Sequence, residues 1–154
     1  MSTSCGVDNS KTNESVEIYL LKKYKWVTGK CKIDASHSVL QDTPIIRNQD
    51  ILEYSQREYQ FKLTDSGLLR MSCFQLYTPF AVTVDKQVVY YGLFIPSIWS
   101  NSCYHSIIMT NDIWSRDKIN IRLGYPGELP TEKMLDERNN TRLLDRLKIQ
   151  GKLR

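Results

Sequence analysis

The stretch from residue 42 to residue 96 most constrains what this chain can fold into, because its local signals describe one complete supersecondary unit. Residues 59–64 alternate apolar and polar side chains, the pattern of a strand with one buried face. Runs of β-branched and aromatic residues predict two further strands, at 80–84 and 88–95, joined by a turn at Asp85. The stretch therefore predicts an α+β unit, with a helix between the first strand and the other two.

The predicted helix of this unit lies between residues 64 and 78. Thr64 or Asp65 provides its N-cap, and Thr78-Pro79 ends it. Cys73 lies on this helix and is expected to be a buried thiol. Four apolar side chains at helical spacing predict one buried stripe: Leu68, Leu69, Met71 and Phe74.

The same unit resembles the first periplasmic head domain of the SecD subunit of the bacterial protein-export machinery. The likeness is carried by a helical turn, a strand, a helix start and a strand pair: Asn48 to Ile51, Tyr59 to Thr64, Asp65-Ser66-Gly67, and Phe80 to Val89 with Asp85 at the turn. No membrane-spanning segments follow, so the resemblance implies a fold and no export function: a small extracytoplasmic sandwich that acts as a binding or scaffold module. The whole chain also resembles uncharacterised lipoproteins of Bacteroides-type bacteria, which implies no activity.

The composition is that of one ordinary globular domain. Hydrophobic residues make up 41% and charged residues 25% of the 154-residue chain, so disorder is limited to its start. Further strands are expected at 16–26, 106–110 and 118–123. We therefore expect residues 16–154 to form a single α+β domain, a mixed or mainly antiparallel sheet with about two helices packed on one face.

The last predicted element is a helix that ends at Gln150, before Gly151. Basic side chains near its C-terminal end suit the helix dipole. Three leucines form its apolar stripe: Leu143, Leu144 and Leu147. The sequence leaves its start open between three capping positions: Thr131, Asp136 and Asn139-Asn140.

The first fifteen residues hold too few apolar side chains to become ordered by burial, so we expect residues 1–15 to form a disordered tether. Within them, Ser2-Thr3-Ser4-Cys5-Gly6 resembles the end of a bacterial lipoprotein signal, in which the Cys receives the lipid. This resemblance implies a lipid attached to Cys5 and a location in the periplasm or at the cell surface. The alternative is a cytoplasmic terminus with an incidental Cys.

If Cys5 carries a lipid, three cysteines remain, and at most one disulfide can form among them. Cys31 and Cys103 lie in polar loops next to predicted strands, whereas Cys73 is on the helix. We therefore predict a Cys31–Cys103 disulfide, which would close a loop of about seventy residues and stabilise the fold by a few kcal/mol in an oxidising compartment. The alternative is three reduced thiols in a cytosolic protein.

Metal binding and catalysis have weaker signals. His37, His105 and the cysteines match no compact zinc motif, so no metal and no cofactor are expected. Cys103 with His105 would suit a small thiol-dependent hydrolase, although no helix N-terminus follows Cys103 to stabilise an oxyanion. A further alternative is a calycin-like barrel that binds an apolar ligand, indicated by the many strands and by Trp26 beside Gly29.

The segment from Lys22 to Lys32 holds five lysines and no acid, with Tyr24 and Trp26 between them. Such a segment can bind nucleic acid, because cations meet phosphates and aromatic rings stack on bases. Lysines also protect an edge strand against pairing with another chain. We interpret the segment as a protected edge strand and expect no nucleic-acid partner.

The loop at 97–105 combines small polar residues with large rings, a composition typical of contact loops. A lid folded onto the core is the alternative. We predict that Trp99, Tyr104 and His105 are contact residues for a ligand or for a protein partner in the cell envelope. The function predicted from the sequence is therefore a non-catalytic binding or scaffold module.

Overall fold

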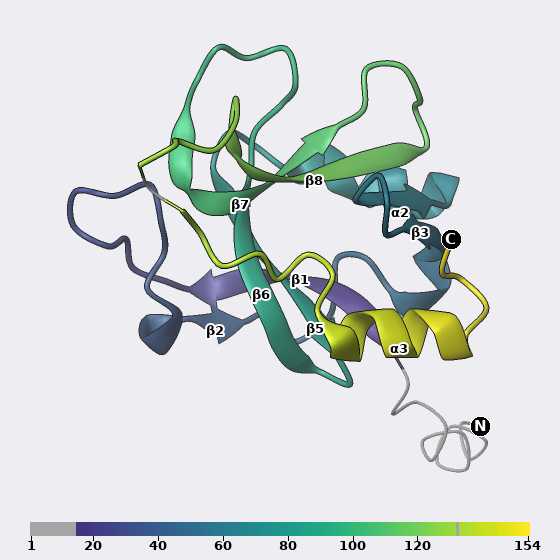
Figure 1. The fold of residues 1–154 in the computed structure, drawn as a ribbon. Coiled ribbons are helices and arrows are strands. Elements are labelled where there is room, and N and C mark those ends of the chain that lie inside the picture. The colour runs from purple at the N-terminus through teal and green to yellow at the C-terminus, as the bar shows by residue number, and fades with distance from the viewer. Residues whose placement is uncertain (1–14, 132) are drawn as a thin grey trace.

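The computed structural model describes residues 15–131 and 133–154, and its centre is one sheet of eight strands (Figure 1). In chain order the strands are β1 (Val16–Lys23), β2 (Val39–Leu40), β3 (Ile51–Ser55), β4 (Gln60–Leu63), β5 (Thr78–Val84), β6 (Gln87–Phe94), β7 (Cys103–Asn111) and β8 (Lys118–Tyr125). Their order across the sheet is β2-β1-β5-β6-β7-β8-β4-β3. Of these strands, β6 and β7 run parallel and all other neighbours are antiparallel. The prediction of an α+β fold with a mainly antiparallel sheet is confirmed.

The helical elements of the described chain are α2 (Asp65–Arg70), α3 (Thr141–Ile149) and the short 3-10 turns η2 (Ala35–His37), η3 (Asn48–Asp50) and η4 (Met71–Cys73). Thr64 caps α2, because its hydroxyl oxygen accepts a hydrogen bond from the Gly67 N–H at 3.1 Å. Asn140 caps α3 through the Arg142 N–H at 2.9 Å. None of the helices formed by the described residues has the length and hydrophobicity needed to cross a membrane.

The sheet is curved, so that β7 and β8 lie across from β1 and β5, with β6 between them (Figure 1). Its inner side holds the larger hydrophobic cluster, whose largest fully buried rings include Tyr54, Phe61 and Phe80. The segment after α2 and helix α3 both contribute to this cluster, through Met71, Phe74, Leu143 and Leu147. Both helices therefore pack on one face of the sheet, as predicted. The sheet is open, with β2 and β3 as its edge strands, and side chains fill the space on its inner side. The fold therefore differs from the closed, ligand-binding barrel considered as an alternative.

A smaller hydrophobic cluster covers the opposite face of the central strands. The alternation of β5 shows how both faces become buried, since Phe80 and Val82 point into the larger cluster and Ala81 between them points into the smaller one. The buried members of the smaller cluster are Leu21, Ile33, Ala81, Leu93, Ile95, Cys103, Ile108 and Tyr125. This second cluster supports the loop after β1 and the start of β7.

Asp50 connects η3 to α2 through a buried carboxylate that is 1% exposed. It accepts hydrogen bonds from the Arg47 N–H at 2.8 Å, from the Thr64 hydroxyl at 3.1 Å and from the Arg70 guanidinium. Burial alone would raise the pKa of this carboxyl, but the hydrogen bonds from Arg47, Arg70 and Thr64 outweigh burial and lower the pKa to about 2. The charged form of Asp50 is therefore part of the folded state.

Helix α2 differs from its prediction. It ends at Arg70 and continues as the 3-10 turn η4, so residues after Arg70 do not keep the α-helical spacing. Met71 and Phe74 are buried as expected, but the Leu69 side chain is 74% exposed. Cys73 is a free, exposed thiol, so the prediction of a buried thiol was wrong.

The strands β2 and β3 were missed. Because β2 was not predicted, the basic end of β1 was interpreted as a protected edge strand. In the structure β1 lies between β2 and β5, so this interpretation was wrong. β2 has two residues and cannot show a periodic pattern. In β3 a register shift between Ile51 and Glu53 interrupts the alternation, which hides the strand from a period-two search.

Candidate binding groove

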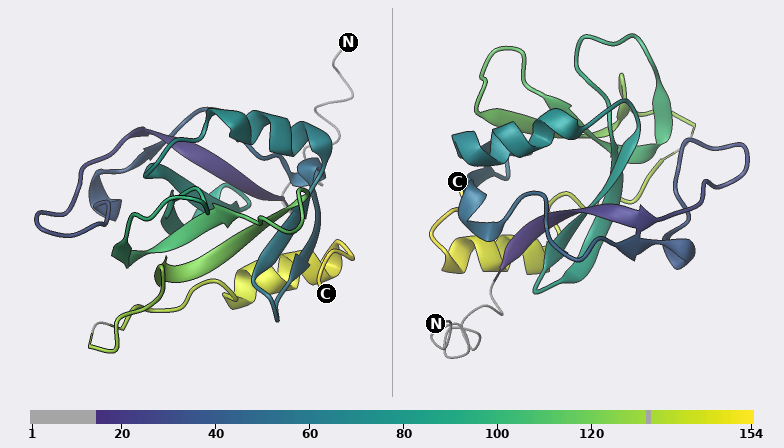
Figure 2. Two further views of the ribbon diagram at one scale, coloured as in Figure 1. Left: turned by 90° about the horizontal axis from the view of Figure 1, so that it is seen from above. Right: turned by 180° about the vertical axis from the view of Figure 1, so that it is seen from behind.

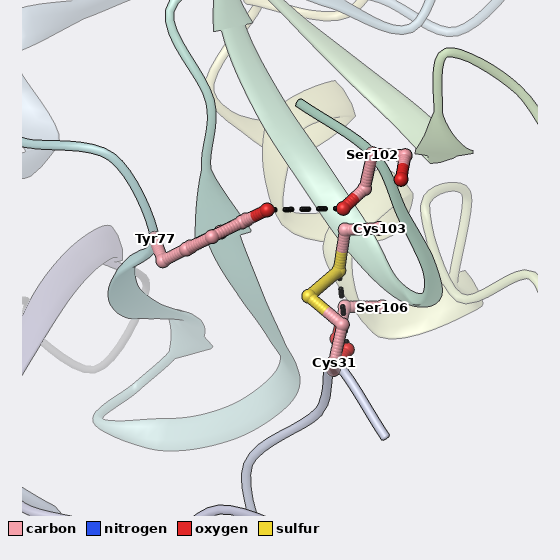
Figure 3. The surroundings of a disulfide bond; sticks show 5 residues. All are labelled: Cys31, Tyr77, Ser102, Cys103 and Ser106. Carbon is pink, nitrogen blue, oxygen red and sulfur yellow. Dashed lines mark hydrogen bonds between the residues drawn. A yellow bond between two sulfur atoms is a disulfide. The ribbon is translucent and has the colours of Figure 1, made fainter. Parts of the chain in front are cut away.

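A disulfide between Cys31 and Cys103 joins the loop after β1 to the first residue of β7, which confirms the predicted pairing (Figure 3). The two Cα atoms are 5.5 Å apart. The Ser106 hydroxyl donates a hydrogen bond to the Cys31 carbonyl oxygen at 2.6 Å, and the Tyr77 hydroxyl donates to the Ser102 carbonyl oxygen at 3.0 Å (Figure 3). The start of β7 is therefore fastened by one covalent bond and by two hydrogen bonds.

The loop after β1 forms a hairpin-like arm next to this disulfide. The Val27 N–H donates to the Lys32 carbonyl oxygen at 2.8 Å, and the Asp34 N–H donates to the Lys25 carbonyl oxygen at 2.8 Å. Gly29 turns the arm with a φ of 75°, a left-handed conformation that suits glycine. The arm therefore holds Lys30 and Lys32 on either side of Cys31 in a defined backbone geometry.

A groove of about 740 Å³ separates this arm from the sheet. Its walls come from the arm, from the β6–β7 pair and from the segment that follows β8. The lining residues are Val27, Lys30, Lys32, Ile33, Asp34, Ala35, Tyr91, Gly92, Tyr104, His105, Ser106, Ile107, Thr131, Lys133, Met134 and Leu135. Four chain segments thus form one concave surface.

Gly92 allows the floor of the groove to form. A Cβ atom at this position would lie 2.6 Å from the Ile107 carbonyl oxygen and 2.5 Å from the Phe80 ring. Gly92 pairs with Ile107 in the parallel β6–β7 ladder, so any larger residue would push these strands apart. The close approach of β6 and β7 places Tyr91 beside Tyr104 and His105 in the same lining.

The groove carries an excess of positive charge. Lys30, Lys32 and Lys133 line it, and none of them forms an ion pair with a described residue. The one described acid in the lining is Asp34, which already accepts hydrogen bonds from Ser36 and from His37 Nδ1. These bonds, Ser36 first and His37 second, lower the pKa of the Asp34 carboxyl to about 2. The lysines are therefore available to an acidic ligand.

The groove also offers ring surface and apolar surface. Tyr91 and Tyr104 are partly exposed in it, and Met134 and Leu135 form part of its rim. A tyrosine hydroxyl is neutral at pH 7 and does not repel an anion, and burial raises the pKa of Tyr91 further. A ligand that fits this lining combines negative charge with apolar or ring-shaped groups.

The predicted contact residues are divided by the structure. Tyr104 and His105 line the groove, whereas Trp99 does not and lies on the preceding loop with 49% exposure. His37 pairs with Asp34 at 2.8 Å and is not among the lining residues. Cys5 lies outside the described residues, as does the expected tether apart from its last residue.

The catalytic and metal-binding alternatives both need free cysteine sulfurs, and the disulfide occupies the sulfurs of Cys31 and Cys103. The sulfur of Cys103 is bonded to Cys31 and 2% of the residue is exposed, so it cannot serve as the thiolate nucleophile of a hydrolase. Both sulfurs are also removed as zinc ligands. Among the described residues no three His, Cys, Asp or Glu side chains are grouped so that they could hold a metal ion.

The lysines and Tyr91 were not predicted as site residues. A usable signal was present for two of them, because a bond between Cys31 and Cys103 necessarily brings Lys30 and Lys32 close to the residues that follow Cys103. No comparable local signal existed for Lys133, which reaches the groove through the path of the segment after β8. Comparison of the chain with protein-family models, with curated proteins and with solved structures finds no match.

Proposed function

We propose that this domain is a non-catalytic binding module. It holds an acidic, partly apolar segment of a protein partner in the groove between the arm and the sheet. The observation that carries this proposal is the gathering of three lysines without ion-pair partners among the described residues, together with Tyr91 and Tyr104, around one concave surface. Charged contacts would select an acidic ligand, and the rings and rim would contribute apolar contact area. The disulfide would keep the arm in place while the ligand leaves and returns.

We further propose that the module works in the cell envelope, attached to a membrane through a lipid on Cys5. The disulfide supports an extracytoplasmic location, because structural disulfides persist in oxidising compartments and are rare in the cytosol. The lipoprotein-like run that ends at Cys5 and the resemblance of residues 42–96 to the SecD head domain support the same location. Mass spectrometry of the chain purified from its native membranes would detect the lipid on Cys5, and an unmodified N-terminus would contradict this part of the proposal.

The experiment for the groove measures binding of a fluorescent peptide of alternating Glu and Leu residues by anisotropy. The triple variant K30A/K32A/K133A is expected to bind about tenfold more weakly, because three partly screened charge contacts together contribute about 1.4 kcal/mol. The matched control is K23A/K25A/K148A, which removes the same charge from exposed lysines outside the groove. This control is expected to bind within about twofold of the parent chain.

Three outcomes would contradict the proposal. Equal weakening in both triple variants would mean that net charge, and not the groove, attracts the peptide. Tighter binding of a single-stranded oligonucleotide than of the peptide would identify a nucleic-acid surface. No binding of the peptide by the parent chain at low salt, where charge attraction is strongest, would remove acidic segments as the ligand class.

A further inference from the structure

Two loops of the chain each carry an exposed Ile-Trp pair, and neither pair lines the groove. The loop between β6 and β7 carries Ile98-Trp99, and the loop between β7 and β8 carries Ile113-Trp114, each pair followed by a serine. The exposed fractions are 84% for Ile98, 49% for Trp99, 60% for Ile113 and 87% for Trp114. Four large apolar side chains therefore face solvent on two loops, which we call the Ile-Trp loops.

The Ile-Trp loops project from the same end of the molecule. Figure 1 shows both above β7 and β8, away from α3, and the view from behind in Figure 2 agrees. Their bases are joined, because the Ser97 N–H donates a hydrogen bond to Asn111 Oδ1 at 3.2 Å. The Tyr125 hydroxyl, beneath the first loop, lies 3.2 Å from the carbonyl oxygens of Ser97 and of Trp99. The two tips are thus presented together from one support.

The second Ile-Trp loop carries a cation, Arg116, that no described residue pairs. Asp112 accepts a hydrogen bond from the Trp114 N–H at 3.2 Å, and Asp117 lies 3.9 Å from Lys62. Arg116 is exposed and forms no ion pair with a described residue. A positive group behind an apolar tip matches the order of layers in a membrane, where anionic headgroups lie outside the acyl chains.

We propose that the Ile-Trp loops insert into the interface of a lipid bilayer. Tryptophan prefers this interface, because its ring is apolar while its indole N–H bonds to headgroups, and isoleucine prefers the acyl region just beneath. Two separate projecting tips suit a surface that deforms around them, whereas a stable protein interface needs a broad complementary patch that excludes water. This inference goes beyond the proposed function, since it uses neither the groove nor Cys5.

The first experiment uses the three tryptophans of the chain as reporters. Trp→Phe substitutions at two of the three positions give single-tryptophan proteins that retain Trp26, Trp99 or Trp114. They are mixed with vesicles of about three parts phosphatidylcholine to one part phosphatidylglycerol, whose headgroup charge models an anionic leaflet. Emission of Trp99 and of Trp114 is expected to shift to the blue and to be quenched by brominated acyl chains. Trp26, 46% exposed on the arm, is expected to show neither change.

The second experiment measures vesicle partitioning by co-sedimentation. Replacing the four tip residues by serine (I98S/W99S/I113S/W114S) is expected to reduce the partition coefficient at least about tenfold, because the buried apolar area is lost. The control is Y24S/W26S, which removes two exposed rings, 41% and 46% exposed, from the arm and is expected to change partitioning less than about twofold. The groove variant K30A/K32A/K133A is expected to keep its blue shift at Trp99 and Trp114, which separates this inference from the proposed function.

The inference fails if the parent chain does not sediment with the vesicles. It also fails if sedimentation disappears in high salt while the emission of Trp99 and Trp114 never shifts, because that result describes charge adsorption without insertion. Equal blue shifts at all three tryptophans would mean unfolding on the vesicle surface. Self-association of the parent chain that the serine variant abolishes, without vesicle binding, would identify the loops as an interface between copies.

Discussion

The groove and the Ile-Trp loops differ in shape, in charge and in the bonds that hold them. The groove is concave and lined by lysines, and its arm is attached to β7 by a disulfide. The Ile-Trp loops are convex and apolar. Their backbone is held by hydrogen bonds that the Ser97 N–H and the Tyr125 hydroxyl donate and by one that Asp112 accepts from the Trp114 N–H. A concave site between segments distant in sequence loses its shape if one wall moves, whereas a projecting tip needs only a stable base.

Strand β7 links the two regions and also separates them. It starts at the disulfide beside the groove and ends at Asn111, the base of the second Ile-Trp loop. Nine residues of strand extend about 27 Å, so Trp114 lies far from the lysine-lined surface along this path. The first Ile-Trp loop, in contrast, leads directly into Cys103, and hydrogen bonds of Ser97 and Tyr125 hold it in addition to this chain connection. We expect these hydrogen bonds to keep the loop in place when the disulfide is removed, and the predictions below test that independence.

The largest expected effect comes from removing the disulfide with C31S/C103S. The two cysteines are 72 residues apart in sequence. In the chain-entropy model a disulfide that closes a loop of this length stabilises the fold by about 4 kcal/mol. Urea unfolding should show a loss of this size. Peptide affinity of the groove should also fall, because the arm that carries Lys30 and Lys32 is released from β7, while partitioning into vesicles should stay unchanged in the folded fraction.

The matched control for this change is C73S, which removes an exposed thiol that takes no part in the disulfide. Its stability and both binding activities should equal those of the parent chain within error. The independence of the two regions would be refuted if C31S/C103S lost vesicle partitioning in proportion to peptide affinity. In that case the disulfide would support the whole of β7 and not the groove end alone.

An intermediate effect is expected from D50N, a change at a residue that belongs neither to the groove lining nor to the Ile-Trp loops. The pKa of Asp50 is about 2 in the folded chain, below its ordinary value near 4, so the carboxylate stabilises the fold above about pH 4 and loses that contribution as the pH falls toward 2. The shift corresponds to about 2 kcal/mol. D50N should therefore be less stable by about that amount at pH 7, and most of the difference should be lost by pH 2, where about half of the Asp50 carboxyls in the folded chain are protonated.

The check is denaturant unfolding of the parent chain and D50N between pH 2 and pH 7. D50N should keep the peptide affinity and vesicle partitioning of the parent chain at temperatures where it stays folded. A constant stability difference across the whole pH range would mean that Asp50 acts through packing and not through its charge. D50N thus shows what a loss of stability alone does to the two binding regions.

The strands were predictable where alternation was uninterrupted, as in β1 and β4, or where β-branched and aromatic residues formed a run, as in β5. β3 was not, because its register shift at Ile51–Glu53 breaks the period that defines a strand in sequence. The helix after β4 was placed correctly at its cap, but its end was not. Its turn into η4 depends on how Met71 and Phe74 reach the core, which is a property of the fold and not of local spacing.

The candidate site was predictable in part for a similar reason. The polar context of Cys31 and Cys103 identified the disulfide, and Tyr104 and His105 follow Cys103 directly in the sequence. Lys133 enters the groove only because the segment after β8 returns past β6 and β7. Trp99 was grouped with Tyr104 by proximity in sequence, yet the loop carries it out of the groove lining. Residues near each other along a loop can thus belong to different surfaces.

The smallest expected effect comes from L69S and tests whether exposure alone explains vesicle binding. The Leu69 side chain on α2 is 74% exposed, which is comparable to the exposure of the Ile-Trp tips. It is a single apolar residue followed by Arg70, which bonds to Asp50 and to Ser66, and it has no neighbouring tryptophan. Isolated exposed leucines are common on soluble surfaces and create no binding site. L69S should therefore change unfolding stability by less than about 0.5 kcal/mol and leave vesicle partitioning unchanged. The comparison is the single tip variant W114S, which removes one side chain of similar exposure and is expected to weaken partitioning. A partitioning loss in L69S as large as that of W114S would show that any exposed apolar side chain drives adsorption, and the distinction between the Ile-Trp loops and the rest of the surface would no longer hold.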